Sequence, residues 1–353
     1  MRYLALISLV ILAFFSDSFS AVGATCVELK GGELNKLEKT YVYKDFRVFW
    51  TEQAPRFGHD HRLPQHSTVD SNNNGIPDLI ENIARQADAS RRAYVTAGFP
   101  DPLGAPRYEG VKFIDINILN MKYNGLAYDA ALAYPAAPGR GIACTLRIDI
   151  SSRLETGLRG PVDKRIQPVF TKHWFVVGHE IFHLFQYGLT QFKRAWINEP
   201  TAKWAEYALR RGSLYQNRME KYSPPGSLRS LQADVIDAPT SRTANLFWSR
   251  LIKLCGNRPR FQALPKGLLE ETYTDGEPIF KDSLWEGMAF IHDVYRGLQN
   301  EDKALSSQYG WNPLNWPEKH QISSEYDNRL IMLIQNSVRK CKDINGANDV
   351  FFD

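Results

Sequence analysis

The pattern of apolar and polar positions divides the chain into two unlike halves. Up to about residue 170, short stretches in which apolar and polar side chains alternate indicate strands at 46–50, 111–118 and 146–150. One helix interrupts them at 79–97, where apolar residues recur every three or four positions. The segment 125–141 is rich in alanine, proline and tyrosine and predicts a loop.

Beyond residue 170 the apolar spacing is mainly helical. A helix at 171–187 is apolar nearly all round, so we expect it to be buried in the middle of the domain. The next helix should begin with Asn198 as its N-cap and Pro200 in its first turn, and should stop at Gly212. Further helices are expected at 243–255, 283–297 and 325–340.

These elements predict an α+β protein, with a β-rich part over residues 25–170 and a mainly helical part over 171–353. The composition fits a globular chain, since 43% of its 353 residues are apolar and 23% are charged. The net charge of +4 is spread over 43 basic and 39 acidic residues, without a basic stripe interleaved with aromatic residues. Nucleic acid is therefore not an expected partner.

The N-terminus has the pattern of an export signal. A basic residue at position 2 precedes the apolar run 4–15, and small residues follow at Val22 and Ala24. We expect cleavage after Ala24, so that residues 1–24 form a signal peptide and the mature chain is secreted or periplasmic. The apolar run is short for a bilayer span, and no stable membrane insertion is expected after cleavage.

Four cysteines remain after this cleavage, namely Cys26, Cys144, Cys255 and Cys341. An even number in an exported chain indicates two disulfides, with three possible pairings. Their wide separation excludes a C-x-x-C metal cluster.

The segment 70–81 matches the calcium-loop pattern D-x-[DN]-x-[DN]-G-x5-E at each specified position. Such a loop supplies oxygen ligands from its first, third, fifth, seventh, ninth and twelfth positions, which here are Asp70, Asn72, Asn74, Ile76, Asp78 and Glu81. No entering helix is expected, because Arg62 to His66 contains proline and lacks an apolar period. Two interpretations stay open: a Ca²⁺ site, or a metal-free helix start rich in Asx side chains.

The helix predicted at 171–187 contains H-E-x-x-H, as His179, Glu180 and His183. On a helix this spacing places two imidazoles one turn apart on one face, with a carboxylate beside them. The alternative is that all three are hydrogen-bonded core residues. Burying three such polar side chains in an apolar helix without partners would be costly, and a zinc ion removes that cost.

A third zinc ligand is expected from W-I-N-E-P-T-A-K-W-A-E, which contains Glu199 and Glu206 seven positions apart. Both carboxylates would lie on one helix face. Glu199 is the preferred ligand, with Glu206 orienting a ligand histidine; Glu206 stays the alternative ligand. Glu180 would then act as general base on a zinc-activated water.

These motifs resemble the gluzincin metallopeptidases, in which an asparagine–glutamate pair after the second histidine supplies the third ligand. The chain is also similar to a group of secreted bacterial metalloproteases typified by a myxobacterial family. That likeness spans about residues 46–256 and includes N-G-I-P-D-L-I-E, V-V-G-H-E-I-F-H-L-F-Q-Y-G and L-F-W-S-R-L. It implies zinc ligation by His179, His183 and Glu199, with Glu180 as base. Only 15 residues separate His183 from Glu199, fewer than in well-known gluzincins.

We therefore expect a zincin-like fold and an exported endopeptidase, with a peptide or protein substrate bound to a sheet edge by strand addition. Two other functions stay open: an inactive surface or adhesion protein stabilised by metal, and a zinc hydrolase of non-peptide substrates. A transition-state hydrogen-bond donor is also expected. The candidates are Tyr187, Tyr207, Tyr222, His292 and Tyr295.

Overall fold

The computed structural model describes residues 26–29, 32–134, 139–141, 143–154, 171–207, 228–255, 263–283, 285 and 287–341. Its N-terminal half contains a mixed, seven-stranded sheet in the order β1-β6-β7-β4-β3-β2, with β5 paired to β7. Strands β3, β4 and β7 are parallel to one another, and β1 is parallel to β6. Strand β2 runs antiparallel to β3, and β5 and β6 both run antiparallel to β7. The strands are β1 (Val27–Glu28), β2 (Lys39–Tyr43), β3 (Phe46–Trp50), β4 (Phe113–Leu119), β5 (Gly125–Ala127), β6 (Leu132–Ala133) and β7 (Thr145–Ser151).

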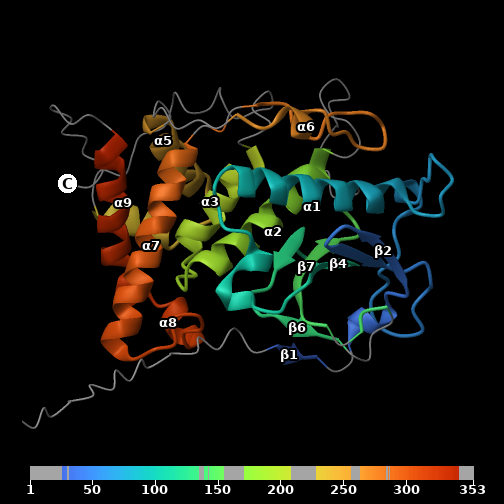
Figure 1. Ribbon diagram of the computed structural model, residues 1–353, viewed down its shortest axis with the longest axis horizontal. Helices are drawn as coiled ribbons and strands as arrows, with labels where there is room; N and C mark the ends of the chain where they lie inside the picture. The colour runs from blue at the N-terminus through green and yellow to red at the C-terminus, as the bar shows by residue number, and fades with distance from the viewer. Residues whose placement is uncertain are drawn as a thin grey trace, which may run out of the picture.

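Helices make up most of the described C-terminal half, which confirms the predicted α+β organisation (Figure 1). The α-helices are α1 (Asp78–Thr96), α2 (Thr171–Leu189), α3 (Ala195–Tyr207), α4 (Leu228–Leu231), α5 (Arg242–Leu254), α6 (Lys266–Leu269), α7 (Met288–Tyr309), α8 (Glu318–Gln321) and α9 (Asp327–Cys341). A π-helix follows α4 at Gln232–Ile236. Short 3₁₀ turns lie at Glu33–Lys36, Gln65–Ser67, Pro102–Gly104, Pro106–Tyr108 and Ser324–Tyr326. None of the described helices is both long enough and apolar enough to cross a bilayer.

One apolar core joins the sheet to the helices. Helices α1 and α2 pack on the face of the sheet formed by residues such as Val48, Ile116 and Ile148, and α3 packs against α2. The same core continues through residues of α5, α7 and α9. Helix α2 is thus buried between the sheet and the other helices, as its apolar composition predicts.

The central strands are buried on both faces, although their alternation of apolar and polar residues would suggest that one face meets solvent. On the face away from α1 and α2, the Asp115 carboxylate accepts hydrogen bonds from Arg47 Nε at 2.7 Å and Arg140 Nη1 at 3.1 Å. All three side chains are buried. Polar residues alternate with apolar ones here because they form buried ion pairs, and not because that face meets water.

Several predicted boundaries were wrong. The segment 125–141, predicted as a loop, contains the short strands β5 and β6. The helix predicted at 283–297 is α7, which runs from Met288 to Tyr309. Glycines with positive φ flank it, Gly287 at 77° and Gly310 at 67°, and this left-handed conformation marks the two ends of the helix.

Helix α3 begins at Ala195, so the prediction that Asn198 is its N-cap was wrong. Pro200 lies inside the helix, where it cannot donate the usual hydrogen bond to the carbonyl of Trp196. The indole N–H of Trp248 donates to that carbonyl instead, at 2.8 Å. This contact from α5 offsets the bond lost at Pro200 and lets the helix start earlier. The predicted stop at Gly212 lies outside the described residues.

A disulfide joins Cys26, next to β1, to Cys144, which precedes β7, with 5.9 Å between the Cα atoms. It confirms one bond of the predicted framework and selects the pairing in which Cys255 would join Cys341. The predicted signal peptide, residues 1–24, lies outside the described residues.

Candidate metal centre

The predicted zinc ligands come together where α2 packs against α3. His179 and His183 lie one turn apart on α2, and their ring centroids are 4.6 Å apart. The Glu199 carboxylate of α3 faces both rings, with Oε2 3.4 Å from His179 Nε2 and Oε1 3.6 Å from His183 Nε2. Among the described residues, these three form the one group of histidine, cysteine and acidic side chains spaced to hold a metal ion.

The spacing of these atoms fits a shared metal ion better than hydrogen bonds. Hydrogen bonds between nitrogen and oxygen usually measure about 2.9–3.0 Å, shorter than both contacts of Glu199. Two ligands of a tetrahedral zinc ion, each about 2.0–2.2 Å from the metal, are about 3.4 Å apart. Two imidazole nitrogens and one carboxylate also form a common donor set for catalytic zinc. The residues present therefore fit zinc.

The second nitrogen of each imidazole is already bound. His179 Nδ1 lies 2.6 Å from Glu206 Oε1, and His183 Nδ1 lies 2.6 Å from Gln186 Oε1. Both partners are acceptors, so each histidine carries a proton on Nδ1, and Nε2 is the nitrogen that faces Glu199. The two imidazoles are thus held in the tautomer and orientation that metal binding requires.

Gln186 is a residue of the site that the sequence analysis missed. Its Nε2 donates to the Asn198 carbonyl at 3.0 Å and to Thr201 Oγ1 at 2.8 Å, so that it links His183 on α2 to the helix that carries Glu199. Tyr295 of α7 completes this buried network, with its hydroxyl 2.8 Å from Thr201 Oγ1. The position of Gln186, three residues after His183, is the sequence signal that could have identified it.

Glu180 lies on the side of α2 that faces strand β5, and its side chain is buried. The backbone N–H of Ala127 acts against this burial and favours the charged form of the Glu180 carboxyl group. Gly125 leaves room for that group, because a Cβ at this position would lie 2.5 Å from Glu180 Oε1 and 2.7 Å from its Cγ. Glu180 is therefore packed against the backbone of a strand that the sequence analysis assigned to a loop.

Burial and neighbouring charges shift the pKa values of the ionisable side chains in this centre. Burial raises the pKa of Glu180 to about 8. Burial and the charge of His179 lower the pKa of His183 to about 4. Burial also acts against charge on His179, but the Glu199 and Glu206 carboxylates outweigh it and raise the pKa of His179 to about 10. The two histidines in turn lower the pKa of Glu199 to about 2, although its burial acts in the opposite direction.

The candidate calcium loop lies away from this centre, before α1. Its twelfth residue, Glu81, accepts hydrogen bonds from Asn72 Nδ2 at 3.0 Å and Asn74 Nδ2 at 3.2 Å. Asp70 accepts from the Gly75 N–H at 2.8 Å, and Asp78 accepts from Ser71 Oγ at 2.6 Å. The loop is thus closed by hydrogen bonds of its own side chains. No α-helix enters it, as expected, because the stretch before it contains only the 3₁₀ turn Gln65–Ser67.

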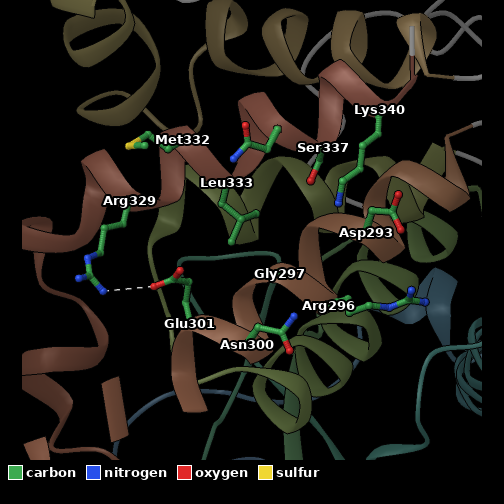
Figure 2. A pocket seen from close by; sticks show the side chains of 11 residues that line it. Asp293, Arg296, Gly297, Asn300, Glu301, Arg329, Met332, Leu333, Ser337 and Lys340 are labelled. Carbon is green, nitrogen blue, oxygen red and sulfur yellow. Dashed lines mark hydrogen bonds and ion pairs between the residues drawn. The ribbon is translucent and has the colours of Figure 1, made fainter. Parts of the chain in front are cut away.

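A pocket of about 400 Å³ lies between α7 and α9 (Figure 2). Its lining includes Leu333 over Gly297 and the ion pair of Arg329 with Glu301, at 3.3 Å. None of the residues of the metal centre lines it. Acidic and basic side chains are mixed around it, so the pocket does not select a ligand charge.

Comparisons of the chain with family models, with curated proteins and with solved structures find no match.

Proposed function

We propose that this protein is an exported zinc-dependent peptidase. The observation that carries the proposal is the spacing of His179, His183 and Glu199, whose ligand atoms all lie within 4.8 Å of one another. A buried carboxylate, Glu180, lies next to this group. The disulfide between Cys26 and Cys144 supports export, because such bonds persist in oxidising compartments.

Zinc held by His179, His183 and Glu199 would polarise a substrate carbonyl and lower the pKa of water towards about 7. Glu180 is the base of the reaction. It takes one proton from the attacking water, whose oxygen bonds to the carbonyl carbon while the π electrons of the C=O bond move to the carbonyl oxygen. The protonated Glu180 then gives its proton to the leaving nitrogen as the C–N bond breaks, which yields a carboxylic acid and an amine.

The edge of β5 supports an extended peptide as the substrate. The N–H of Ser151 in β7 donates to the Asn124 carbonyl at 2.9 Å, and the Tyr128 N–H donates to the carbonyl of Arg147 in β7 at 3.0 Å. In an antiparallel pair the hydrogen-bonded residues alternate, so the backbone N–H and C=O groups of Gly125 and Ala127 point away from β7. A peptide strand that pairs with this edge would bring its carbonyl groups beside the metal centre.

The test compares the wild type with Glu180→Gln on a quenched fluorescent casein substrate, together with the zinc content of both proteins. We expect one zinc per chain in each protein and a loss of about 10²–10⁴-fold in kcat for the variant. A matched exposed variant, Glu270→Gln, should behave as the wild type, because Glu270 has no contact with the centre.

Four results would contradict the proposal. A wild type purified without loss of metal that contains no zinc would exclude the metal centre. Undiminished activity of Glu180→Gln would exclude its role as base. Chelator-sensitive hydrolysis of esters or glycans, without cleavage of casein or of a peptide library, would instead indicate a zinc hydrolase of non-peptide substrates. Zinc without any hydrolysis would indicate a protein that metal only stabilises.

A further inference from the structure

Tyr187 lies on the same face of α2 as the proposed base and one of the proposed zinc ligands. Glu180, His183 and Tyr187 are spaced i, i+3 and i+7, which places all three on one face of the helix. Long aromatic side chains on a helix lean towards its N-terminus. The phenol of Tyr187 therefore leans over the turn that contains His183.

The observed contacts agree with this direction. The rings of Tyr187 and His183 are stacked, with 5.7 Å between centroids and 6° between planes. The ammonium of Lys193 lies 5.6 Å from the centroid of the Tyr187 ring. Contacts with His183 and Lys193 thus fix the plane of the tyrosine ring.

The hydroxyl of Tyr187 is available as a donor. It forms no hydrogen bond with another residue in the part of the chain that the structure describes. A tyrosine phenol ordinarily keeps its proton at neutral pH, so it can donate.

Of the other described candidates, Tyr295 is already hydrogen-bonded, whereas the buried Nε2 of His292 has no hydrogen-bond partner among the described residues. The hydroxyl of Tyr295 lies 2.8 Å from Thr201 Oγ1 within the network that supports Gln186. His292 packs against Phe99, with ring centroids 4.7 Å apart, beside Gly98. The side chains of Tyr207 and Tyr222 lie outside those described, so the assignment depends on the position of Tyr187 and not on their exclusion.

We propose that the Tyr187 hydroxyl donates a hydrogen bond to the oxyanion that forms on the scissile carbonyl oxygen, an assignment that rests on the proposed hydrolytic function. The hydrogen bond strengthens when the π electrons of the C=O bond move to oxygen, and it weakens when that pair returns and the C–N bond breaks. Tyr187 keeps its proton throughout. Such a donor stabilises the transition state more than the bound substrate.

The test is Tyr187→Phe, which keeps the ring stacked on His183 and removes only the hydroxyl. We expect kcat to fall about 10²–10³-fold while KM changes less than about twofold, with zinc content unchanged. The affinity for a phosphonamidate peptide, whose tetrahedral phosphorus carries the charge of the intermediate, should fall by the same factor as kcat/KM. The affinity for the product peptide should stay constant. Tyr309→Phe is the matched control, because Tyr309 is exposed on the last turn of α7.

Four outcomes would overturn the assignment. Tyr187→Phe could retain full kcat, or it could lose zinc, which would make its role structural. Tyr207→Phe or Tyr222→Phe could lose the phosphonamidate affinity in its place. The zinc-loaded wild type could hydrolyse neither peptides nor esters, in which case the proposed function itself fails and Tyr187 has no oxyanion to bind. If the wild type hydrolyses esters alone, the peptidase is refuted, and an unchanged kcat of Tyr187→Phe on the ester would overturn the assignment as well.

Discussion

His179 is held between two carboxylates that contact different nitrogens: Nδ1 lies 2.6 Å from Glu206, and Nε2 lies 3.4 Å from Glu199. The short contact is a charge-assisted hydrogen bond that fixes the tautomer of the imidazole. The longer contact has the length of one edge of a zinc coordination tetrahedron. The seven-residue spacing of the two glutamates places both near His179, but their distances favour different roles.

The two glutamates should therefore differ when each is removed. Glu199→Ala is expected to lose zinc, because it removes the carboxylate that faces both Nε2 atoms. Glu206→Gln should retain one zinc and bind it about 10–100-fold more weakly, since the amide can still accept a hydrogen bond from Nδ1 but lacks the charge. Zinc content by mass spectrometry and competition with a chelator would measure both. Zinc loss in the Glu206 variant alone would assign the ligand role to Glu206.

Zinc binding should release protons near neutral pH. Without metal, the neighbouring carboxylates raise the pKa of His179 to about 10, so it is protonated at pH 7 and must lose that proton to bind zinc. His183, with a pKa lowered to about 4, is already neutral. If His179 alone releases a proton, as in Glu180→Gln, zinc affinity should therefore rise about tenfold per pH unit between pH 7 and 9 and level off above the pKa of His179.

Calorimetry in buffers of different ionisation enthalpy would count these protons. Glu180→Gln is the informative protein, because the pKa of Glu180 is itself raised to about 8 and a nearby cation would release its proton as well. The variant should release about one proton at pH 7, which His179 supplies. Release of none would mean that His179 is neutral before zinc binds.

Local patterns predicted the helices of the metal centre, but not all of the contacts that complete it. The periodicity of α2 and the pair of histidines within it are properties of one segment, so they could be predicted from the sequence. Strand β5 could not, because its three residues show no clear alternation and become a strand through pairing with Ile148–Ile150. In the first turn of α3, the Trp196 carbonyl accepts its hydrogen bond from Trp248 of α5, a contact that no local rule contains.

Gly125 should be necessary for activity although it supplies no functional group. Its replacement by alanine would place a methyl group 2.7 Å from the Cγ of Glu180, and either β5 or the carboxyl group must then move. We expect Gly125→Ala to bind zinc normally and to lose about 10²-fold in kcat/KM, a loss that a displacement of about 1 Å can cause. Gly267→Ala is the control, because a Cβ there meets no atom within 4 Å. Full activity of Gly125→Ala would show that the contact of Glu180 with β5 is not part of the catalytic geometry.

The loop that contains Asp70 and Glu81 should bind Ca²⁺ and stabilise the start of α1. Two asparagines in place of aspartates leave few charges, so we expect a dissociation constant in the range of about 10⁻⁴–10⁻³ M. At 10 mM Ca²⁺ such a site would add about 1.4–2.7 kcal/mol to the free energy of unfolding, measurable as a rise in Tm of a few degrees. Asp70→Ala should abolish this rise, and Mg²⁺ at the same concentration should produce little of it, because a flexible oxygen cage of this size favours the larger ion. A wild-type Tm that does not respond to Ca²⁺ would support the alternative, a helix start held by the hydrogen bonds of Asn72 and Asn74 to Glu81.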